Sequence, residues 1–280
     1  MIRRATSEDA KGIIKLVSSI FPNESIVRYG HEALHANLIA DAYISYVAEV
    51  GHCIVGHAGI FVNRGIATLN ALVVSPDFRG RKYARAMNEK RLEYCETNDS
   101  ITHAVIYSML QHSFGQRLYD ASFRPIGVSL SEGNPFSQED GEIFGRDKIN
   151  AEIALCHARK FGQPKIRINY AGKLRGRIQK IYDEIKIPVE FHELGKYIEK
   201  TLEDNIEIDL SKEDAGSIIA AAERQDFIFL GILPSIKDGL NIIGFASPEF
   251  IKNYQKPFSA NTKEREEFVR SILYPQICAP

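Results

Sequence analysis

Three cations follow an apolar stretch at a point where the chain is expected to turn. Leu72, Val73 and Val74 end a run typical of a strand, and Ser75-Pro76-Asp77 interrupts it. A helix is expected to begin within the next residues, which are Arg79, Gly80, Arg81, Lys82, Tyr83 and Ala84. The first amides of a helix have no partner within it, and the helix dipole adds positive charge there. The pattern therefore predicts an anion site that suits a diphosphate.

The same residues resemble a known cofactor loop. The pattern V-x-P-x-x-R-G-x-x-x-A from Val74 to Ala84 resembles the acetyl-CoA pyrophosphate loop of the GNAT N-acetyltransferases, Arg/Gln-x-x-Gly-x-Gly/Ala. Arg79 and Ala84 match its ends, and Lys82 stands where the family usually has glycine. The resemblance implies acetyl-CoA as cosubstrate, bound by residues 72–74 and 79–84. The alternative interpretation is a solvated basic helix start.

A second stretch, residues 111–123, resembles the other GNAT signature, a helix that ends in Tyr-x-x-x-Gly-Phe. Phe123 matches the phenylalanine, and the aligned tyrosine position falls on Leu118, so that Tyr119 is displaced by one residue. The resemblance implies that Ser113, Gln116 and Tyr119 contact the cofactor. Two signatures in the expected order favour the GNAT fold.

Acetyl transfer to an amine needs a base, a donor for the oxyanion and an acid for the leaving thiolate. Many GNAT enzymes use a glutamate on the central strand as base, but residues 67–71 contain no carboxylate. The candidate replacements are Glu49, His57 and a water held by Asn70. His57 is attractive because the unperturbed pKa of histidine lies near neutral pH; the alternative interpretation is a packed strand residue.

The remaining roles are assigned from the resemblance. Tyr119 is the first candidate for the acid, and Tyr107 is held in reserve. His112 is interpreted either as a helix cap or as a participant in catalysis. A backbone amide near Val73 or Val74 is expected to bind the oxyanion.

The hydrophobic pattern predicts an α/β (α+β) chain that begins with a βααβββαβ unit. Thr6-x-x-Asp9 resembles a capping box that opens the first helix, whose apolar positions include Ile13, Val17 and Ile20. Strands are expected at 1–5, 42–50, 53–63, 68–74 and 101–110, and further helices at 24–40 and 81–95. The helix at 24–40, near the acceptor site in the family, carries Arg28, Tyr29, His31 and His35. In the GNAT fold the mixed central sheet is splayed, and the pantetheine lies in the gap.

The chain of 280 residues is longer than one such unit. Residues 1–135 are predicted to form the acetyltransferase domain and residues 148–280 a degenerate second GNAT-like domain. The latter resembles the carboxy-terminal lobe of two-lobed bacterial GNAT proteins through Tyr170, Ile181-Tyr182, residues 226–234 and Gly239-Leu240. Its expected strands are 151–157, 165–170, 189–192, 206–210, 227–230 and 240–245, and its helices 171–185, 212–224 and 262–273.

Composition limits the partners. A formal net charge of −1 argues against nucleic acid, and no apolar run reaches the ~20 residues of a membrane helix. Four scattered cysteines suit a reducing cytoplasm without a zinc site, and Cys53 and Cys95 are interpreted as core residues. We expect a cytoplasmic protein without bound metal, with a small-molecule or peptide amine as acceptor; a homodimer is one option for its assembly.

The predicted function is acetyl-CoA-dependent N-acetylation of a primary amine by direct attack. The alternative is a binding or scaffolding protein that keeps the fold and binds acyl-CoA without turnover. Lys82, the missing central carboxylate and the displaced Tyr119 favour that alternative.

Overall fold

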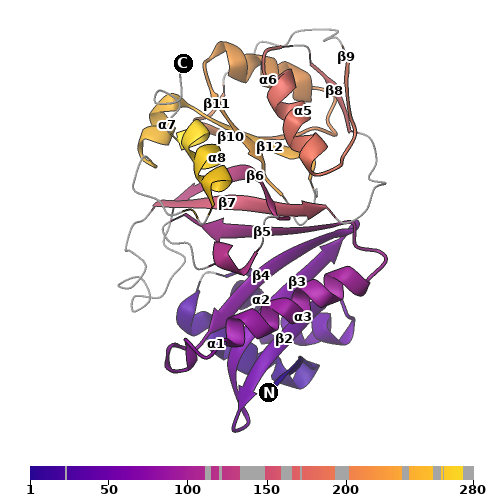
Figure 1. Cartoon of the computed structure of the whole chain (residues 1–280), viewed down its shortest axis with the longest axis vertical. Helices are drawn as coiled ribbons and strands as arrows, with labels where there is room; N and C mark the ends of the chain where they lie inside the picture. The colour runs from indigo at the N-terminus through magenta and orange to yellow at the C-terminus, as the bar shows by residue number, and fades with distance from the viewer. Residues whose placement is uncertain are drawn as a thin grey trace. The chain divides into compact units, whose positions relative to one another are not determined.

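The computed structural model describes residues 1–22, 24–110, 115–119, 122–132, 149–158, 166–170, 172–192, 202–234, 240–254, 260 and 262–273. Its packing separates two units, which are described one at a time (Figure 1). The described part of the first unit is Met1–Ile106. The second unit comprises the described residues of Tyr107–Glu132 and Ile149–Pro280.

The first unit is built on a mixed sheet with strand order β1-β2-β3-β4-β5. Neighbouring strands are antiparallel from β1 to β4, and β4 and β5 are parallel. The predicted strands are all present, as β1 (Ile2–Arg4), β2 (Tyr43–Val50), β3 (Cys53–Asn63), β4 (Ile66–Val74) and β5 (His103–Met109). The two hairpins turn at Gly51-His52 and Arg64-Gly65, where all four residues have positive φ. Paired positive φ values match the twist of the flanking strands in two-residue hairpins.

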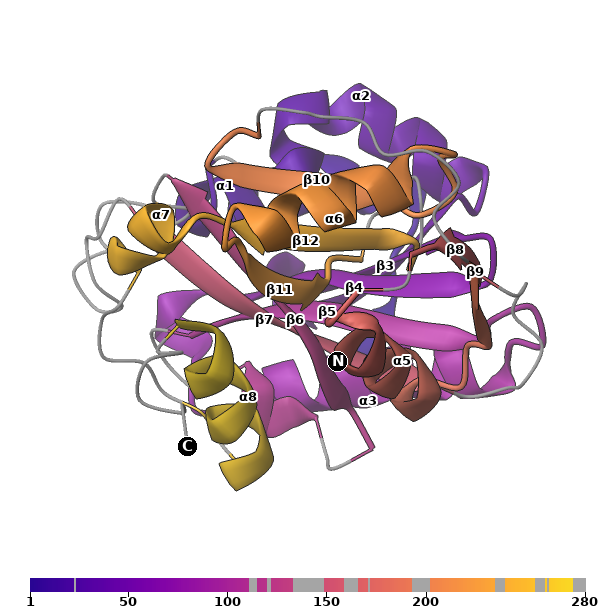
Figure 2. The same cartoon turned by 90° about the horizontal axis from the view of Figure 1, so that it is seen from above.

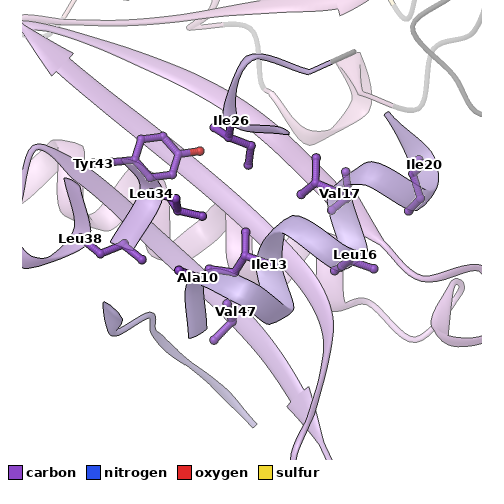
Figure 3. Packing of buried hydrophobic residues seen from close by; sticks show 11 residues of the cluster. Ala10, Ile13, Leu16, Val17, Ile20, Ile26, Leu34, Leu38, Tyr43 and Val47 are labelled. Atoms are coloured by element: carbon purple, nitrogen blue, oxygen red, sulfur yellow. The ribbon is translucent and has the colours of Figure 1, made fainter. Parts of the chain in front are cut away.

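Helices cover both faces of this sheet. After η1 (Ser7–Asp9), α1 (Ala10–Ile20) buries the predicted apolar positions Ile13, Val17 and Ile20. Figure 3 shows these side chains packing with Tyr43 and Val47 of β2, together with residues of α2 (Ser25–Ile39). On the opposite face, Met87 of α3 (Tyr83–Thr97) packs on strand residues such as Ala48 and Ala58. The sheet is therefore buried between α1 and α2 on one side and α3 on the other.

The capping box predicted at Thr6 and Asp9 is present: the Thr6 amide donates to Asp9 Oδ2 over 2.8 Å. The second helix differs from the single helix predicted at 24–40, because Gly30 has φ 81° and ψ 173° and kinks α2. Glycine adopts this conformation without a steric cost, so it allows the change of direction. The polar residues predicted beside the acceptor site, Arg28, Tyr29, His31 and His35, are all exposed on α2.

The second unit contains a sheet with strand order β7-β6-β11-β12-β10, and Figure 2 shows these strands in succession. Its strands are β6 (Arg124–Glu132), β7 (Ile149–Ala158), β10 (Asn205–Asp209), β11 (Ile228–Ile232) and β12 (Ile242–Ala246), with a separate parallel pair β8 (Ile166–Asn169) and β9 (Val189–His192). Helices α5 (Arg175–Glu184), α6 (Ala215–Arg224) and α8 (Lys263–Leu273) lie within the predicted ranges. The sequence reasoning missed the short α7 (Pro248–Lys252).

The strand predicted to open the second domain, β7, pairs antiparallel along its length with β6, which lies before the predicted boundary. The predicted boundary between residues 135 and 148 falls outside the described residues, so the division into domains 1–135 and 148–280 stays a prediction. No helix in the described part of the chain combines the length and the apolar run needed to cross a membrane.

Gly59 of β3 lies beneath the Tyr43 side chain. A Cβ at Gly59 would overlap the Tyr43 hydroxyl and lie 2.6 Å from Asn70 Oδ1. Because Tyr43 is buried and donates its hydroxyl hydrogen to Asn70 Oδ1 over 2.9 Å, it has little room to move. Only a residue without a side chain fits here.

We therefore expect Gly59→Ala to lower the free energy of unfolding by roughly 1–3 kcal/mol through overpacking. Urea unfolding followed by circular dichroism measures the effect. Gly176→Ala is the control, because a Cβ at Gly176 has no neighbour within 4 Å and alanine is the better helix former. Equal stability of Gly59→Ala and the wild type would contradict the packing described.

Candidate functional site

Strand β4 carries one residue more than its partner β3. His57 pairs with Val73 and Gly59 with Asn70, so that Ala71 and Leu72 together stand opposite a single residue of β3. Ala71 has φ 45°, in the left-handed region that a residue with a side chain rarely occupies. This β-bulge turns the backbone of β4 locally out of its ladder, as bulges next to functional sites often do.

The bulge is held by His57 on β3. The Nδ1 atom of His57 lies 2.9 Å from the Ala71 carbonyl oxygen. Since a carbonyl only accepts hydrogen bonds, Nδ1 carries the proton, and Nε2 is left with its lone pair. The side chain is 0 % exposed, and burial lowers its pKa to about 4 against the ordinary 6.5, assisted by the charge of Arg91. The ring is therefore neutral at pH 7.

Asn70, immediately before the bulge, accepts hydrogen bonds at both its side-chain oxygen and its backbone carbonyl. Its side-chain Oδ1 accepts from the Tyr43 hydroxyl, and its backbone carbonyl accepts from Arg91 NH1 over 3.2 Å. Arg91 is 0 % exposed, and its NH1 also donates to the Gly59 carbonyl over 3.3 Å. Asn88, one turn earlier on α3, orients the guanidinium by accepting from NH2 over 2.7 Å.

On the edge of β4 that faces away from β3, the pairing with β5 is short. Among the described residues, β5 pairs with β4 at Ile66, Ala67 and Thr68, and β4 continues for six residues beyond that point. The Ser75 amide donates to the Val55 carbonyl over 2.9 Å, so alternation directs the Val73 amide toward β3 and the Leu72 and Val74 amides to the opposite edge. Of the two amides predicted for the oxyanion, Val74 thus lies on this edge, with Leu72 at the bulge.

Strand β4 leads through η2 (Pro76–Phe78) into a turn with two left-handed residues before α3 begins at Tyr83. Gly80 has φ 75°, and Lys82, the helix N-cap, has φ 66°. Lys82 therefore adopts the backbone conformation for which glycine is preferred, although its side chain is not that of the family. The Ala86 amide donates to the Lys82 carbonyl, which is the first hydrogen bond of the helix. The amides before Ala86 in the first turn therefore have no acceptor within the helix. The predicted helix start at residue 81 is two residues early.

The cations of the turn are fixed by contacts within it. Arg79 Nε donates to the Val74 carbonyl over 3.2 Å. Arg81 NH2 donates to the Asp77 carbonyl over 3.2 Å, and its guanidinium carbon lies 5.0 Å from the centre of the Phe78 ring. Arg81 and Lys82 are exposed, so their charges remain available to a ligand.

Glu49 lies at the hairpin end of β2, away from the bulge. Arg3 Nε donates to Glu49 Oε2 over 2.8 Å, and the same guanidinium binds both oxygens of Asp9. Hydrogen bonding of Asp9 with Arg3 is the main reason that the pKa of Asp9 is lowered. Arg3 therefore joins Glu49 to the capping box of the first helix.

The candidates of the second signature belong to the second unit. Of the helix expected within residues 111–123, the described residues 115–119 and 122–123 contain a 3-10 turn, η3 (Gln116–Leu118). Tyr119 is buried, with its ring centre 4.8 Å from that of Phe123, and Gln116 is buried as well. The Tyr107 hydroxyl donates to the Pro234 carbonyl over 2.9 Å. His112 and Ser113 lie outside the described residues.

One further prediction was wrong. Cys53 is exposed, because it is the first residue of β3 directly after the turn, whereas Cys95 is buried as expected. Sequence reasoning also missed Tyr43 and Arg91. A signal for Arg91 was available: it lies four residues from Met87 and from Cys95, on the helix face that both bury. Among the described residues, no cluster of three potential metal-ligating side chains occurs.

The model of the Acetyltransferase (GNAT) family matches residues 11–121, which is less than half of the chain. Residues 11–121 are therefore similar to a GNAT acetyltransferase domain. The match includes the bulged strand, the cationic turn and the start of α3. It leaves the second unit almost entirely outside, so the two-lobed type and the degenerate second lobe stay predictions.

Several solved structures resemble part of the chain. A GNAT-family acetyltransferase of Streptococcus pneumoniae has 16% identity and a TM-score of 0.46 and covers 57% of this chain and 99% of its own. The ribosomal-protein-S18-alanine N-acetyltransferase of Escherichia coli has 13% identity and a TM-score of 0.44, and the match covers 58% of this chain and 97% of that one. The PaiA N-acetyltransferase of Thermoplasma acidophilum, in complex with coenzyme A, has 15% identity and a TM-score of 0.40, and the match covers 57% of this chain and 98% of that one. Similarity at this level says nothing about the substrate. No curated protein matches the sequence significantly.

The left-handed conformation of Lys82 leads to a stability prediction. The left-handed conformation destabilises a residue with a Cβ by roughly 1–2 kcal/mol, and glycine avoids this steric cost. Glycine also has more conformational entropy in the unfolded chain, which lowers stability and partly offsets that gain. Lys82→Gly is therefore expected to leave the free energy of unfolding unchanged or to raise it by up to about 1 kcal/mol. Urea unfolding measures this.

The matched control is Glu89→Gly, which places glycine at an exposed position inside α3 with ordinary helical backbone. This change is expected to cost about 1 kcal/mol. Equal losses in the two variants would show that residue 82 is not left-handed in solution.

The pKa of His57 gives a pH prediction. The folded pKa of about 4 lies below 6.5, so between these values the unfolded chain binds the extra proton. The free energy of unfolding should therefore fall as the pH is lowered from about 6.5 to about 4, by up to about 3 kcal/mol from this group. His57→Asn should flatten this part of the profile, measured by urea titrations across that range. His35→Asn, at an exposed position, should keep the wild-type slope.

Proposed function

We propose that the chain is an acetyl-CoA-dependent N-acetyltransferase that transfers acetyl to a primary amine by direct attack. The proposal rests on one structural observation: a bulged strand, whose Leu72 and Val74 amides point away from β3, continues directly into a cationic turn and a helix N-terminus. Both parts have the chemistry that a thioester cofactor with a diphosphate requires. The GNAT match over residues 11–121 supports acetyl transfer as the type of reaction.

The turn fits the diphosphate. The left-handed backbone at Gly80 and Lys82 leads into the first amides of α3, and a helix start of this kind favours anions. A Cβ at Gly80 would have no neighbour within 4 Å, so space is open above the turn. Arg81 and Lys82 add exposed positive charge. Acetyl-CoA would therefore place its phosphates at residues 79–84.

The edge of β4 fits the rest of the cofactor. The amide groups of pantetheine need hydrogen-bond partners, and an unpaired strand edge offers them. The Leu72 and Val74 amides lie on that edge, between the short ladder with β5 and the turn. The thioester carbonyl would then lie beside the bulge, where the Leu72 amide is directed away from β3.

With the thioester at this position, acetyl transfer would proceed by direct attack of the amine on the thioester. The amine nitrogen forms a bond to the thioester carbonyl carbon, and the carbonyl oxygen becomes an oxyanion that accepts from the Leu72 amide. Collapse of this adduct breaks the carbon–sulfur bond, and the thiolate takes up one proton as the nitrogen loses one. An oxyanion donor of this kind is often worth about 3 kcal/mol.

The contacts around the three predicted proton acceptors favour water as the base. His57 is neutral and weakly basic, with its Nδ1 proton committed to Ala71. The Glu49 carboxylate is bound by Arg3 at the far end of the hairpin, and Asn70 Oδ1 accepts from Tyr43. We therefore propose that the amine loses its proton to water. The acceptor is a small-molecule or peptide amine.

Isothermal titration with acetyl-CoA tests the turn. Removing one charged phosphate contact in Arg79→Ala or Arg81→Ala should weaken binding by about 2 kcal/mol, or roughly 30-fold. Lys15→Ala removes an exposed cation on α1 and is the control, for which unchanged affinity is expected. Unchanged affinity in both arginine variants would exclude the turn as the phosphate site.

Turnover is tested separately by thiol release from acetyl-CoA with a panel of small primary amines and peptides with free amino termini. Acetylated product, identified by mass spectrometry, would support the transferase. Tight binding of acetyl-CoA without product from any amine would favour a binding protein that keeps the fold.

A further inference from the structure

The peptide group between Ala71 and Leu72 joins the bulge to the edge of β4 that faces away from β3. Its carbonyl oxygen accepts from His57 Nδ1 over 2.9 Å, and its N–H is the Leu72 amide. In a planar trans peptide the C=O and N–H bonds point in opposite directions. A side chain that fixes the Ala71 carbonyl toward β3 therefore also fixes the Leu72 N–H away from β3.

The imidazole is itself held in place. Its ring stacks with that of Tyr43, with centroids 6.2 Å apart and an interplanar angle of 20°. It is fully buried, and Nε2 has no hydrogen-bond partner among the described residues. Within the described part of the chain, the hydrogen bond to Ala71 is thus the only one that the ring makes, and burial keeps the ring neutral. A buried polar side chain with one satisfied nitrogen is costly, and such a group is expected to serve the contact that it does make.

The preceding peptide group is held from the opposite face of the sheet. Arg91 NH1 donates to the carbonyl of Asn70, which belongs to the Asn70–Ala71 peptide. Two consecutive peptide groups of the bulge thus each receive a side-chain hydrogen bond, one from β3 and one from α3. Hydrogen bonds to a carbonyl polarise the peptide and strengthen its N–H as a donor.

We propose that His57 is a positioning residue that aims and polarises the Leu72 amide, the donor to the thioester carbonyl. The proposal rests on the proposed function, because it needs acetyl-CoA on the β4 edge. It assigns His57 a role through the backbone in place of the proton-accepting role considered from the sequence. The feature that matters is a hydrogen-bond donor at the Nδ1 position, and basicity is not required.

Asparagine separates these two roles. Its side-chain NH2 can take the place of Nδ1–H as a donor, but it has no basic nitrogen. His57→Asn should keep the aim of the Leu72 amide, whereas His57→Leu should lose it. A base would be lost equally in both variants.

Infrared difference spectroscopy of bound acetyl-CoA, labelled with 13C at the acetyl carbonyl, measures the contact directly. A hydrogen bond to the thioester carbonyl lowers its stretching frequency. We expect the lowered frequency in the wild type and in His57→Asn, and a frequency close to that of free acetyl-CoA in His57→Leu. Coenzyme A without the acetyl group should bind all three proteins with similar affinity, because the turn at residues 79–84 is unchanged.

An unshifted carbonyl band in His57→Leu relative to the wild type would overturn the positioning role while leaving the proposed function intact. Failure of the wild type to bind acetyl-CoA would instead overturn the proposed function. If His57→Leu does not fold, NMR of the wild type decides: the Leu72 amide proton should move downfield with acetyl-CoA and not with coenzyme A. No difference between the two ligands would refute the proposal.

Discussion

A strand with one residue too many cannot keep all of its amides in the ladder, and this constraint organises the first unit. The extra residue in β4 forces Ala71 to a φ of 45° and rotates the peptide group that follows. Such a conformation persists only where its surroundings determine it. Here Tyr43, His57, Asn70 and Arg91 form a buried polar layer through the sheet around the bulge. Several polar side chains of this unit thus contact a single backbone irregularity or its neighbours.

The elements of both units could largely be predicted from the sequence, because their signals are local. Apolar spacing identified α1, and Gly51-His52 and Arg64-Gly65 marked the two hairpins. The prediction of one continuous helix at 24–40 failed at Gly30, since a glycine within a helical pattern is usually tolerated and its φ depends on tertiary packing. The helix expected at residues 111–123 came from a resemblance, and only the short η3 is found in the described part of that stretch, so its cofactor contacts stay predictions.

The site was predicted in part. The cationic turn could be recognised because its residue types and its place between a strand and a helix are both visible in a sequence. The bulge was not, because Ala71 and Leu72 look like ordinary strand residues, and only the pairing with β3 reveals the extra position. His57 was identified as a candidate for its basicity, yet burial makes it a weak base and a fixed donor. Burial of this kind depends on α1 and α2, which are remote in sequence.

Lys82 shows how side-chain patterns and backbone geometry can separate. The glycine usual in the family is absent, which from sequence alone favoured a lost cofactor site. The backbone nevertheless has φ 66° at this position, a conformation that glycine adopts without strain, while the side chain adds a positive charge. A turn is therefore better judged by the conformation that it adopts than by the residue that normally allows it. The same reasoning applies to the bulge, where the donor is a backbone amide that any residue supplies. The sequence signal of such a site lies in the side chains that hold the backbone, and in this chain those are His57 and Arg91.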